Sequence, residues 1–431
     1  MKKKFLATVL CLMLSLTTVA CSSTTKTASN DATQKPASNA KVQLTYWSFF
    51  GGGEGTYMQT IVDNFNKSQS NIVVKNVIQQ WGTPYYTKLT TAVAAGKGPD
   101  VGSAHISMLP ALVDTGTINP LDDYAKDINI DWSKFNKNIL ASTVSDGVHY
   151  AVPLDTHPFV MFYNKTLLKN AGLLSSDGKP IMEPGVEGFE KFLATLKQKL
   201  PAGVYPLAES NSGDDIYRLW YSLYVQQGPT TLLSADMKKS SIDMAKAVKS
   251  ADFCKSLFTK GYVQKNLADF VKTFSSGKAA ITFTGVWCTP VFESTKGLVF
   301  GVGELPTLMG KSATWGDSHT IIIPVQKTED KAKLDAAMKF ANFVADSAPI
   351  WAKAGHIPAS DKVVASAEFK KLPYRSDYVT AASHVVFFSK STTNWAMFDI
   401  IKKDLDTIWN GSKDSKTALT KMTSDIDNLV K

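Results

Sequence analysis

The sequence is poor in arginine, and this scarcity limits what the protein can bind. Only Arg218 and Arg375 stand among its 47 basic residues, so the formal net charge of +9 comes almost entirely from lysine. Recognition of bases and phosphates favours the forked guanidinium group over the lysine ammonium group. The lysine excess therefore indicates a solubilising surface, and we expect no nucleic-acid partner.

Cysteine is also scarce, with four residues, at positions 11, 21, 254 and 288. No CxxC, HExxH or similar ligand spacing is present, so the sequence predicts no metal site, and we expect no cofactor. In an exported chain Cys254 and Cys288 could pair as a disulfide. Both also suit buried thiols, because Cys254 lies in a helical run and Cys288 stands beside Trp287. The sequence leaves these two alternatives open.

Long apolar runs are missing as well. The N-terminal run over residues 5–16 is shorter than the ~20 residues that a membrane-spanning helix needs. Three lysines, Lys2–Lys4, precede this run, and the small residue Ala20 follows it. This arrangement is typical of a secretory signal, which we assign to residues 1–20.

The residues at the end of this signal indicate how the mature protein is attached to the membrane. Val19-Ala20-Cys21 resembles a bacterial lipoprotein signal, in which Cys21 becomes the lipidated first residue, although Thr18 stands where leucine is usual. Residues 21–40 are rich in Ser, Thr and Ala and predict a flexible tether. We expect an extracytoplasmic protein anchored by lipid to the outer face of the cell membrane. Ordinary signal cleavage beside an incidental cysteine is the alternative.

The rest of the chain has the composition of a folded protein. It is 431 residues long with 44% hydrophobic residues, which excludes a disordered chain and predicts two or more domains. From residue 42 apolar strands alternate with amphipathic helices. We expect strands at 42–48, 72–78 and 101–105 and helices at 57–65, 85–95 and 108–115. This order predicts a parallel sheet with helices on both faces, and ligand binding beyond the carboxyl ends of its strands.

Later elements continue the α/β pattern. We expect two short strands within 149–164, a helix from Lys165, helices at 187–197, 214–224, 241–258 and 267–276, strands at 279–284 and 320–324, a helix at 331–345 and helical structure to residue 431. The strand at 320–324 and its helix resemble the first block more than the second. The pattern therefore predicts two α/β lobes between which the chain crosses more than once.

Five segments of the mature chain resemble one protein family in their order and spacing. They are LTYWSFFGG with GTYMQTIVDNFNKSQSNIVV, YYTKLTTAVAAGKGPDVGSAHISMLPALVDTGTINPLDDY, YAVPLDTHPFVMFYNKTLLKNAGL, FSSGKAAITFTGVW and FANFVADSAPIWAKAGHIPA. The chain resembles the solute-binding proteins of bacterial ABC importers, in the carbohydrate-type family that includes maltose-binding protein.

This resemblance implies a two-lobed, periplasmic-binding-protein-like (Venus-flytrap) α/β fold of type II, with several chain crossovers at the hinge. We expect one lobe to comprise residues 41–153 and 318–358, and the other residues 154–317 and 359–431. The resemblance also implies a monomeric receptor without enzymatic activity. It would close on a carbohydrate, which we expect to be an oligosaccharide, and deliver it to the permease subunits of an ABC transporter.

Sugars present apolar C–H faces and a rim of hydroxyls, so their sites need aromatic plates with paired donors and acceptors. The aromatic candidates are Trp47, Phe50, Trp81, Trp220, Trp287 and Trp315, with Trp395 as a lesser one. The resemblance places a sugar-stacking tryptophan at Trp287. Packing in the core is the alternative for these aromatic residues, notably for Trp220, which shares an apolar helix face with Ile216 and Leu223.

The polar candidates are Glu54, His105, Asp155, His157 and His319. A carboxylate can accept two sugar hydroxyls, and a neutral imidazole both donates and accepts. Asp155 and His157 lie where the chain passes between the lobes, and His105 ends the third strand. A hinge turn capped by Asp155 is the alternative there, as is stabilisation of a helix dipole for Glu54.

Two other classes of function fit the residues less well. Gly51–Gly53 suggest phosphate binding, but Glu54 would repel an anion and no P-loop motif follows. A glycerol-phosphate-type solute remains the alternative within the same superfamily. A secreted glycoside hydrolase would need two carboxylates ~5–10 Å apart. No motif marks Asp155 with Asp317 or Glu54 as such a pair.

Overall fold

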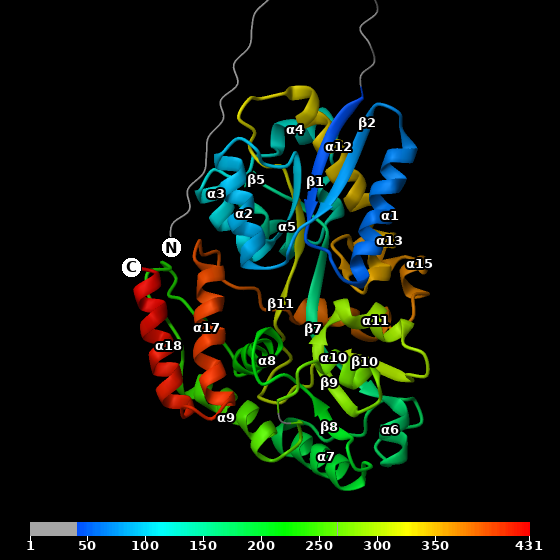
Figure 1. Cartoon of the computed structure of the whole chain (residues 1–431), viewed down its shortest axis with the longest axis vertical. Coiled ribbons are helices and arrows are strands. Elements are labelled where there is room, and N and C mark those ends of the chain that lie inside the picture. Colours follow the sequence, from blue (N-terminus) through cyan, green and yellow to red (C-terminus); the bar gives the residue numbers. More distant parts are fainter. Residues whose placement is uncertain (1–40, 265) are drawn as a thin grey trace, which may run out of the picture. The chain divides into compact units, whose positions relative to one another are not determined.

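The computed structural model of the chain describes residues 41–264 and 266–431 (Figure 1). The predicted signal peptide, the lipidation site at Cys21 and the tether up to residue 40 lie outside the described residues. Among those described, no helix has the length and apolar character that crossing a membrane would require. The described chain is built around two larger β-sheets and one short hairpin.

The first sheet has the strand order β2-β1-β3-β12-β6. Its strands are β1 (Val42–Ser48), β2 (Ile72–Ile78), β3 (Val101–His105), β6 (Val152–Pro153) and β12 (His319–Ile322). Strands β1, β2 and β3 are parallel, because helical crossovers connect them, and this confirms the prediction for these strands. Strand β12 runs antiparallel to both β3 and β6, so the sheet is mixed rather than wholly parallel.

The helices associated with this sheet bury apolar faces in a common core. They are α1 (Gly53–Ser68), α2 (Thr83–Ala94), α3 (Leu109–Asp114), α4 (Asp122–Asp127), α5 (Lys137–Ser142), α12 (Lys331–Asp346) and α13 (Ala348–Trp351). In α1, Met58, Ile61 and Phe65 recur every three or four residues and therefore share one buried face. The hairpin of β4 (Val144–Ser145) and β5 (Val148–His149) follows α5.

The second sheet contains the strand order β10-β7-β9-β8, and β11 and β13 also pair with β7. Its strands are β7 (Asp155–Asn164), β8 (Tyr205–Ala208), β9 (Ala279–Gly285), β10 (Phe300–Glu304), β11 (Gly316–Asp317) and β13 (Ile357–Pro358). Two short strands were predicted within 149–164, whereas β6 is followed by a ten-residue β7 whose residues are all buried. A strand enclosed on both faces lacks the polar alternation that marks strand limits in a sequence.

Helices also pack around this second sheet. They are α6 (Lys165–Asn170), α7 (Gly185–Lys199), α8 (Asp214–Val225), α9 (Met244–Thr259), α10 (Phe270–Ser275) and α11 (Thr289–Ser294). The C-terminal helices are α14 (Asp361–Ala365), α15 (Ala367–Lys370), α16 (Arg375–Tyr378), α17 (Asn394–Trp409) and α18 (Ser415–Leu429), of which α17 and α18 pack against α9. Cys254 and Cys288 are buried free thiols, so the disulfide alternative does not hold.

The described chain passes between the two sheets at three places. Strand β6 leads directly into β7, β11 leads into β12, and the segment after α13 returns to form β13 against β7 (Figure 1). The strand register then brings distant residues face to face: His319 with His105, Asp317 with His157, and Pro358 with Asp155. Polar residues from all three crossings therefore gather beside the carboxyl end of β3.

Candidate ligand-binding site

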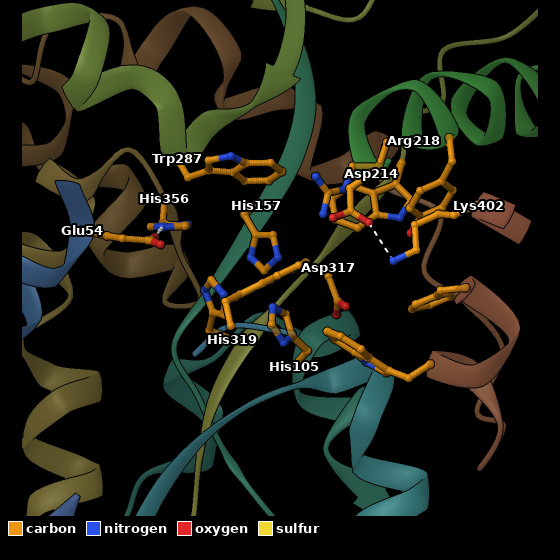
Figure 2. Close-up of a pocket in the computed structure, with 15 residues that line it drawn as sticks. Glu54, His105, His157, Asp214, Arg218, Trp287, Asp317, His319, His356 and Lys402 are labelled. Carbon is orange, nitrogen blue, oxygen red and sulfur yellow. Dashed lines mark hydrogen bonds and ion pairs between the residues drawn. The ribbon is translucent and has the colours of Figure 1, made fainter. Parts of the chain in front are cut away.

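A pocket with a volume of about 280 Å³ lies where these crossings meet. Figure 2 shows the side chains that line it, which come from elements of both sheets and from the C-terminal helix α17. They are Glu54, Trp81, His105, His157, Asp214, Tyr217, Arg218, Trp287, Trp315, Asp317, His319, His356, Trp395, Phe398 and Lys402. Because imidazole, charged and aromatic groups face the same space, the pocket suits a ligand with polar edges and apolar faces.

Seven of the eleven residues proposed from the sequence as ligand contacts line this pocket: Glu54, Trp81, His105, His157, Trp287, Trp315 and His319. Two of them show how strand ends position side chains. His105 is the last residue of β3, and Trp287 lies in the single turn (Val286–Cys288) that follows β9. Both positions follow the general rule that ligands bind beyond the carboxyl ends of strands.

Two proposed tryptophans lie elsewhere. Trp220 is fully buried in α8, and its Nε1 donates a hydrogen bond to the Ala247 carbonyl at 3.1 Å, so the core-packing alternative holds for this residue. Trp47 is half-buried at the end of β1, with the Lys88 ammonium group 4.8 Å from the centre of its ring. Neither indole is among the side chains that line the pocket.

Two further proposed residues lie directly behind the pocket wall. Phe50 is fully buried and packs edge-on against His319 and Trp351. Asp155 is also fully buried, and its carboxylate binds the rings of His157 and His319 instead of facing the pocket. These two residues support the site from behind and do not line it.

One end of the pocket is formed by His105, His157, His319 and His356, which we call the histidine cluster. It contains four of the six histidines of the chain. The rings of His157 and His319 stack with centroids 4.1 Å apart, and the ring of His319 lies 4.8 Å from that of His105 and 5.1 Å from that of His356. These rings form one continuous wall (Figure 2).

Hydrogen bonds hold each ring of the histidine cluster. The Nδ1 atoms of His157 and His319 lie 2.9 Å and 2.8 Å from the two oxygens of Asp155. The hydroxyl of Tyr86 accepts from the backbone N–H of His105 and lies 2.7 Å from Nδ1 of the same residue. A carboxylate can only accept, so His157 and His319 donate from Nδ1, whereas Tyr86 donates to His105.

The charges of these groups follow from burial and from their neighbours. Burial lowers the pKa of His105 well below its ordinary value and that of His157 to about 3, so both rings are neutral at pH 7. Burial would also lower the pKa of His319, but the carboxylates of Asp155, Glu54 and Asp317 together outweigh burial and raise that pKa. His105 therefore offers an Nε2–H donor to the pocket, while His157 offers an Nε2 acceptor.

The aromatic side chains of the lining, which we call the aromatic end, are Trp81, Tyr217, Trp287, Trp315, Trp395 and Phe398. They border the histidine cluster, because the ring centroid of Trp287 lies 5.8 Å from that of His157 and the ring centroid of Trp395 lies 5.7 Å from that of His105. Trp81 is 43% exposed and its ring centroid lies 5.8 Å from that of Trp395. Trp287 and Trp315 meet almost at right angles, with centroids 6.2 Å apart. Gly285 permits this placement, because a Cβ atom there would overlap the indole of Trp287. Several ring faces are thus presented to one ligand.

The basic groups of the pocket are already paired with carboxylates. Arg218 lies between the rings of Trp287 and Trp315, 5.1 Å and 4.5 Å from their centres, and binds Asp215 at 2.5 Å. Lys402 is 3.1 Å from Asp214, the pair drawn in Figure 2. Neither cation is left to balance the charge of an anionic ligand.

The carboxylate of Asp317, which lines the pocket, is fixed in place by a hydrogen bond. Asp317 accepts a hydrogen bond from the Ser107 hydroxyl at 2.5 Å. Burial raises its pKa to about 6, although this hydrogen bond opposes the shift. Asp317 therefore adds a further polar edge to the pocket.

The lining also contains residues that were not proposed from the sequence: Asp214, Tyr217, Arg218, Asp317, His356, Phe398 and Lys402. Helical spacing could have found some of them. Trp395, Phe398 and Lys402 recur at i, i+3 and i+7 and so share one face of α17. No comparable local signal marks His356, because its place in the pocket depends on the pairing of β13 with β7.

Residues 60–375 match a protein family described as bacterial extracellular solute-binding protein. This match covers well over half of the chain. The chain belongs to this family. It is accordingly a solute-binding protein and not an enzyme, as the sequence predicted. A maltooligosaccharide ABC transporter solute-binding lipoprotein of Streptococcus pneumoniae is 23% identical over 443 residues, covering 97% of this chain and 95% of that protein.

Solved structures of similar proteins confirm the fold of this solute-binding protein. The GacH receptor of Streptomyces glaucescens, solved unliganded and with acarbose, matches with a TM-score of 0.79 at 20% identity, covering 91% of this chain and 99% of GacH. UgpB of Mycobacterium tuberculosis in complex with glycerophosphocholine matches with a TM-score of 0.78 at 18% identity, covering 90% and 98%. These likenesses establish the two-lobed α/β fold.

Proposed function

We propose that this solute-binding protein is the carbohydrate receptor of an ABC importer and that its ligand is an oligosaccharide. The observation that carries the proposal is that one pocket is lined both by the aromatic end and by the histidine cluster, which border one another. Indole faces bind the apolar C–H faces of sugar rings, while imidazoles bind the hydroxyl rim. A pocket with both kinds of surface therefore suits a sugar.

Individual roles follow from the geometry. Trp81 and Trp287 would stack on sugar rings, because Trp81 is exposed and Trp287 is half-buried at the pocket wall. His105 would donate from Nε2 to a hydroxyl oxygen and His157 would accept from a hydroxyl at its Nε2 atom. Glu54, which binds His356 with one oxygen at 2.6 Å, keeps its other oxygen for a further hydroxyl.

The transport role rests on the relatives. The similar pneumococcal protein is named as a maltooligosaccharide-binding lipoprotein of an ABC transporter. We propose that the lobes predicted above close on the sugar as a monomer and present it to the permease. Cys21 would carry the lipid that holds the receptor at the outer face of the membrane. If so, Cys21→Ser releases the protein into the medium, and retention in the membrane fraction would contradict the anchor.

A glycerophosphodiester is the second candidate ligand, because the fold is also similar to that of UgpB bound to glycerophosphocholine. The pairing of Arg218 with Asp215 and of Lys402 with Asp214 argues for a neutral ligand. Breaking such a pair to bind a phosphate would leave a carboxylate without its partner, at a cost of several kcal/mol when buried.

A binding screen distinguishes these ligands. The chain is tested by thermal shift and calorimetry against mono- and oligosaccharides and against glycerophosphocholine. We expect micromolar affinity for an oligosaccharide, equivalent to about −8 kcal/mol, and none for the phosphodiester. The reverse pattern would select the second candidate. Release of reducing ends during incubation would contradict a receptor without catalysis.

A further inference from the structure

Three residues of the histidine cluster surround the buried carboxylate of Asp155. One nitrogen from each of His157, His319 and His356 and one oxygen of Asp155 all lie within 4.8 Å of one another. All four residues are buried, and this is the one group of potential metal ligands found in the part of the chain that the structure describes. These residues come from three separate chain crossings, so no linear motif could reveal them.

His356 provides the second observation. Its Nε2 lies 2.6 Å from an oxygen of Glu54, and because a carboxylate only accepts, the Nε2 proton is donated to Glu54. The Nδ1 atom of the same ring has no hydrogen-bond partner among residues 41–264 and 266–431. Nδ1 lies 3.6 Å from Oδ2 of Asp155. A fully buried ring nitrogen without a hydrogen-bond partner therefore faces a carboxylate oxygen, and a cation between them would satisfy both atoms.

The spacing suits such a cation. Nitrogen and oxygen donors ~2.1 Å from a tetrahedral zinc ion lie ~3.4 Å apart. The Nδ1 atoms of His157, His319 and His356 are 2.9, 2.8 and 3.6 Å from oxygens of Asp155. The four ligand atoms lie within 4.8 Å of one another, so the widest-spaced of them would have to approach by up to ~1.4 Å to reach the spacing of a tetrahedral site. An ion bound there would displace the Nδ1 protons that His157 and His319 donate to Asp155.

The outer contacts also suit a metal site. Metal-binding histidines usually give their other ring N–H to a carboxylate or carbonyl, which fixes the ring. Glu54 does this for His356 (Figure 2). The indole of Trp351 stacks on His356 with an angle of 2° between the rings, and its Nε1 donates to Asp155 at 2.6 Å. Both His356 and Asp155 are therefore held in place from behind.

We propose that His157, His319, His356 and Asp155 form a binding site for one divalent transition-metal ion of the Zn²⁺ class. Three imidazoles and one carboxylate are the donors that zinc and its late first-row neighbours favour over Mg²⁺ or Ca²⁺. Because three of these residues also line the pocket, an ion bound here would fix one wall of the ligand site. The proposal does not depend on the identity of the solute.

The test is a titration of the chelator-treated chain with Zn²⁺ alone, followed by calorimetry and by thermal melting. We expect one ion per chain and a higher melting temperature in its presence. His356→Gln should weaken Zn²⁺ binding at least about 100-fold, since loss of a contact outside the ligand shell already costs 10–100-fold. Co²⁺, used as a coloured probe, should give a visible spectrum that this variant loses.

Two histidines outside the cluster serve as matched controls. His149 lies 2.8 Å from Asp122 and His384 lies 2.6 Å from Glu304, so each has a carboxylate partner but no second imidazole in such a group. His149→Gln and His384→Gln should bind Zn²⁺ as the unmodified chain does. Circular dichroism shows whether each variant is folded, and Asp155→Asn replaces His356→Gln if the latter is not.

Two results would overturn the proposal. One is the absence of Zn²⁺ binding to the chelator-treated chain, which would mean that a proton alone lies between His356 and Asp155. The other is Zn²⁺ binding that His356→Gln and Asp155→Asn leave unchanged, which would place the ion elsewhere. Sugar binding is measured separately on the metal-free chain, so failure of the metal site is distinguishable from failure of the proposed receptor function.

Discussion

The two ends of the pocket hold their side chains in different ways. In the histidine cluster, the rings of His157 and His319 are buried and bound through Nδ1 to a single carboxylate, that of Asp155. At the aromatic end, Trp81 is 43% exposed, and Nε1 of Trp395 has no hydrogen-bond partner among the described residues. The histidine cluster is wholly buried, whereas the aromatic end combines the buried rings of Tyr217, Trp315 and Phe398 with the exposed indole of Trp81.

This difference separates stability from binding. The histidine cluster lies on the three crossings that join the sheets, so its hydrogen bonds also hold these crossings together. At the aromatic end, Trp81 is exposed and loses its solvent contact when a ligand covers it, whereas Trp315 belongs to the core and Trp287 packs against it. We therefore expect substitutions in the histidine cluster to change stability and affinity together, and substitution of the exposed Trp81 to change affinity alone.

Asp155→Ala should have the largest effect. The substitution leaves His157 and His319 without their shared acceptor in a buried site, and breaking a buried charged pair costs about 3–5 kcal/mol. The free energy of unfolding in urea measures this loss, and sugar affinity should fall with it. Asp122→Ala removes the partner of the half-buried His149 outside the pocket and should cost about 1 kcal/mol or less. Equal losses for the two variants would contradict a stabilising role for the cluster.

The same difference explains how far the sequence predicts the molecule. Strands β1, β2 and β3 were predicted at their observed limits, because short apolar segments between amphipathic helices are a local signal. Trp81 was proposed for the site because it follows a strand, and Trp287 because the family resemblance places a sugar-stacking tryptophan there. Trp220 could not be distinguished from these pocket residues by sequence alone. Nearly every residue of α8 is buried, so no exposed face indicates which side of the helix faces the core and which faces the pocket.

The histidine cluster could be predicted only in part. His105 and His319 end or begin strands and were proposed, whereas His356 was missed. Its contact with Glu54 joins residues 302 positions apart in the sequence. Such a contact depends on the third crossing and on the register of β13 against β7, and neither has a local sequence pattern. Helical spacing places Lys402 on one face of α17 with Trp395 and Phe398, but that this face reaches the pocket follows only from the packing of the C-terminal helices.

Trp287→Ala should have the second-largest effect on affinity, with a smaller loss of stability because the half-buried indole also packs against the core. Loss of the indole removes a stacking face and part of the contact that orients Arg218, and sugar affinity should fall more than about tenfold, or ~1.4 kcal/mol. Calorimetry measures the change. Trp132→Ala is the matched control, because this half-buried tryptophan stacks on His149 outside the pocket. Unchanged affinity in Trp287→Ala would remove this residue from the site.

Trp81→Ala should have a smaller effect of the same kind. Because its indole is partly exposed, the substitution removes less buried contact with the sugar than Trp287→Ala does. We expect sugar affinity to fall about three- to tenfold with an unchanged melting temperature. Ile78→Ala is the control, since this side chain is 54% exposed on the neighbouring strand end but does not line the pocket. A fall in melting temperature for Trp81→Ala would show that the aromatic end also supports the fold.

The smallest effect concerns the junction of α8 and α17 behind the aromatic end. There the carboxylate of Asp406 accepts from the backbone N–H of Gly213, and burial raises its pKa to about 6. The ordinary value for aspartate is ~3.9, so the folded chain binds this proton more tightly than the unfolded chain. The stability that this group contributes is complete below pH ~4 and is lost as the pH rises through about 6.

Asp406→Asn keeps an acceptor for Gly213 and removes the charge. The variant should be more stable than the unmodified chain at pH 7.5, by about 1 kcal/mol or less because the half-buried group is partly screened by water, and the gain should vanish near pH 4. Urea unfolding at the two pH values measures the difference. Asp123→Asn, at a fully exposed carboxylate, controls for the loss of one negative charge. A gain of equal size at both pH values would show that the buried charge of Asp406 is not the source of the gain. The contact between α8 and α17 would then be independent of pH.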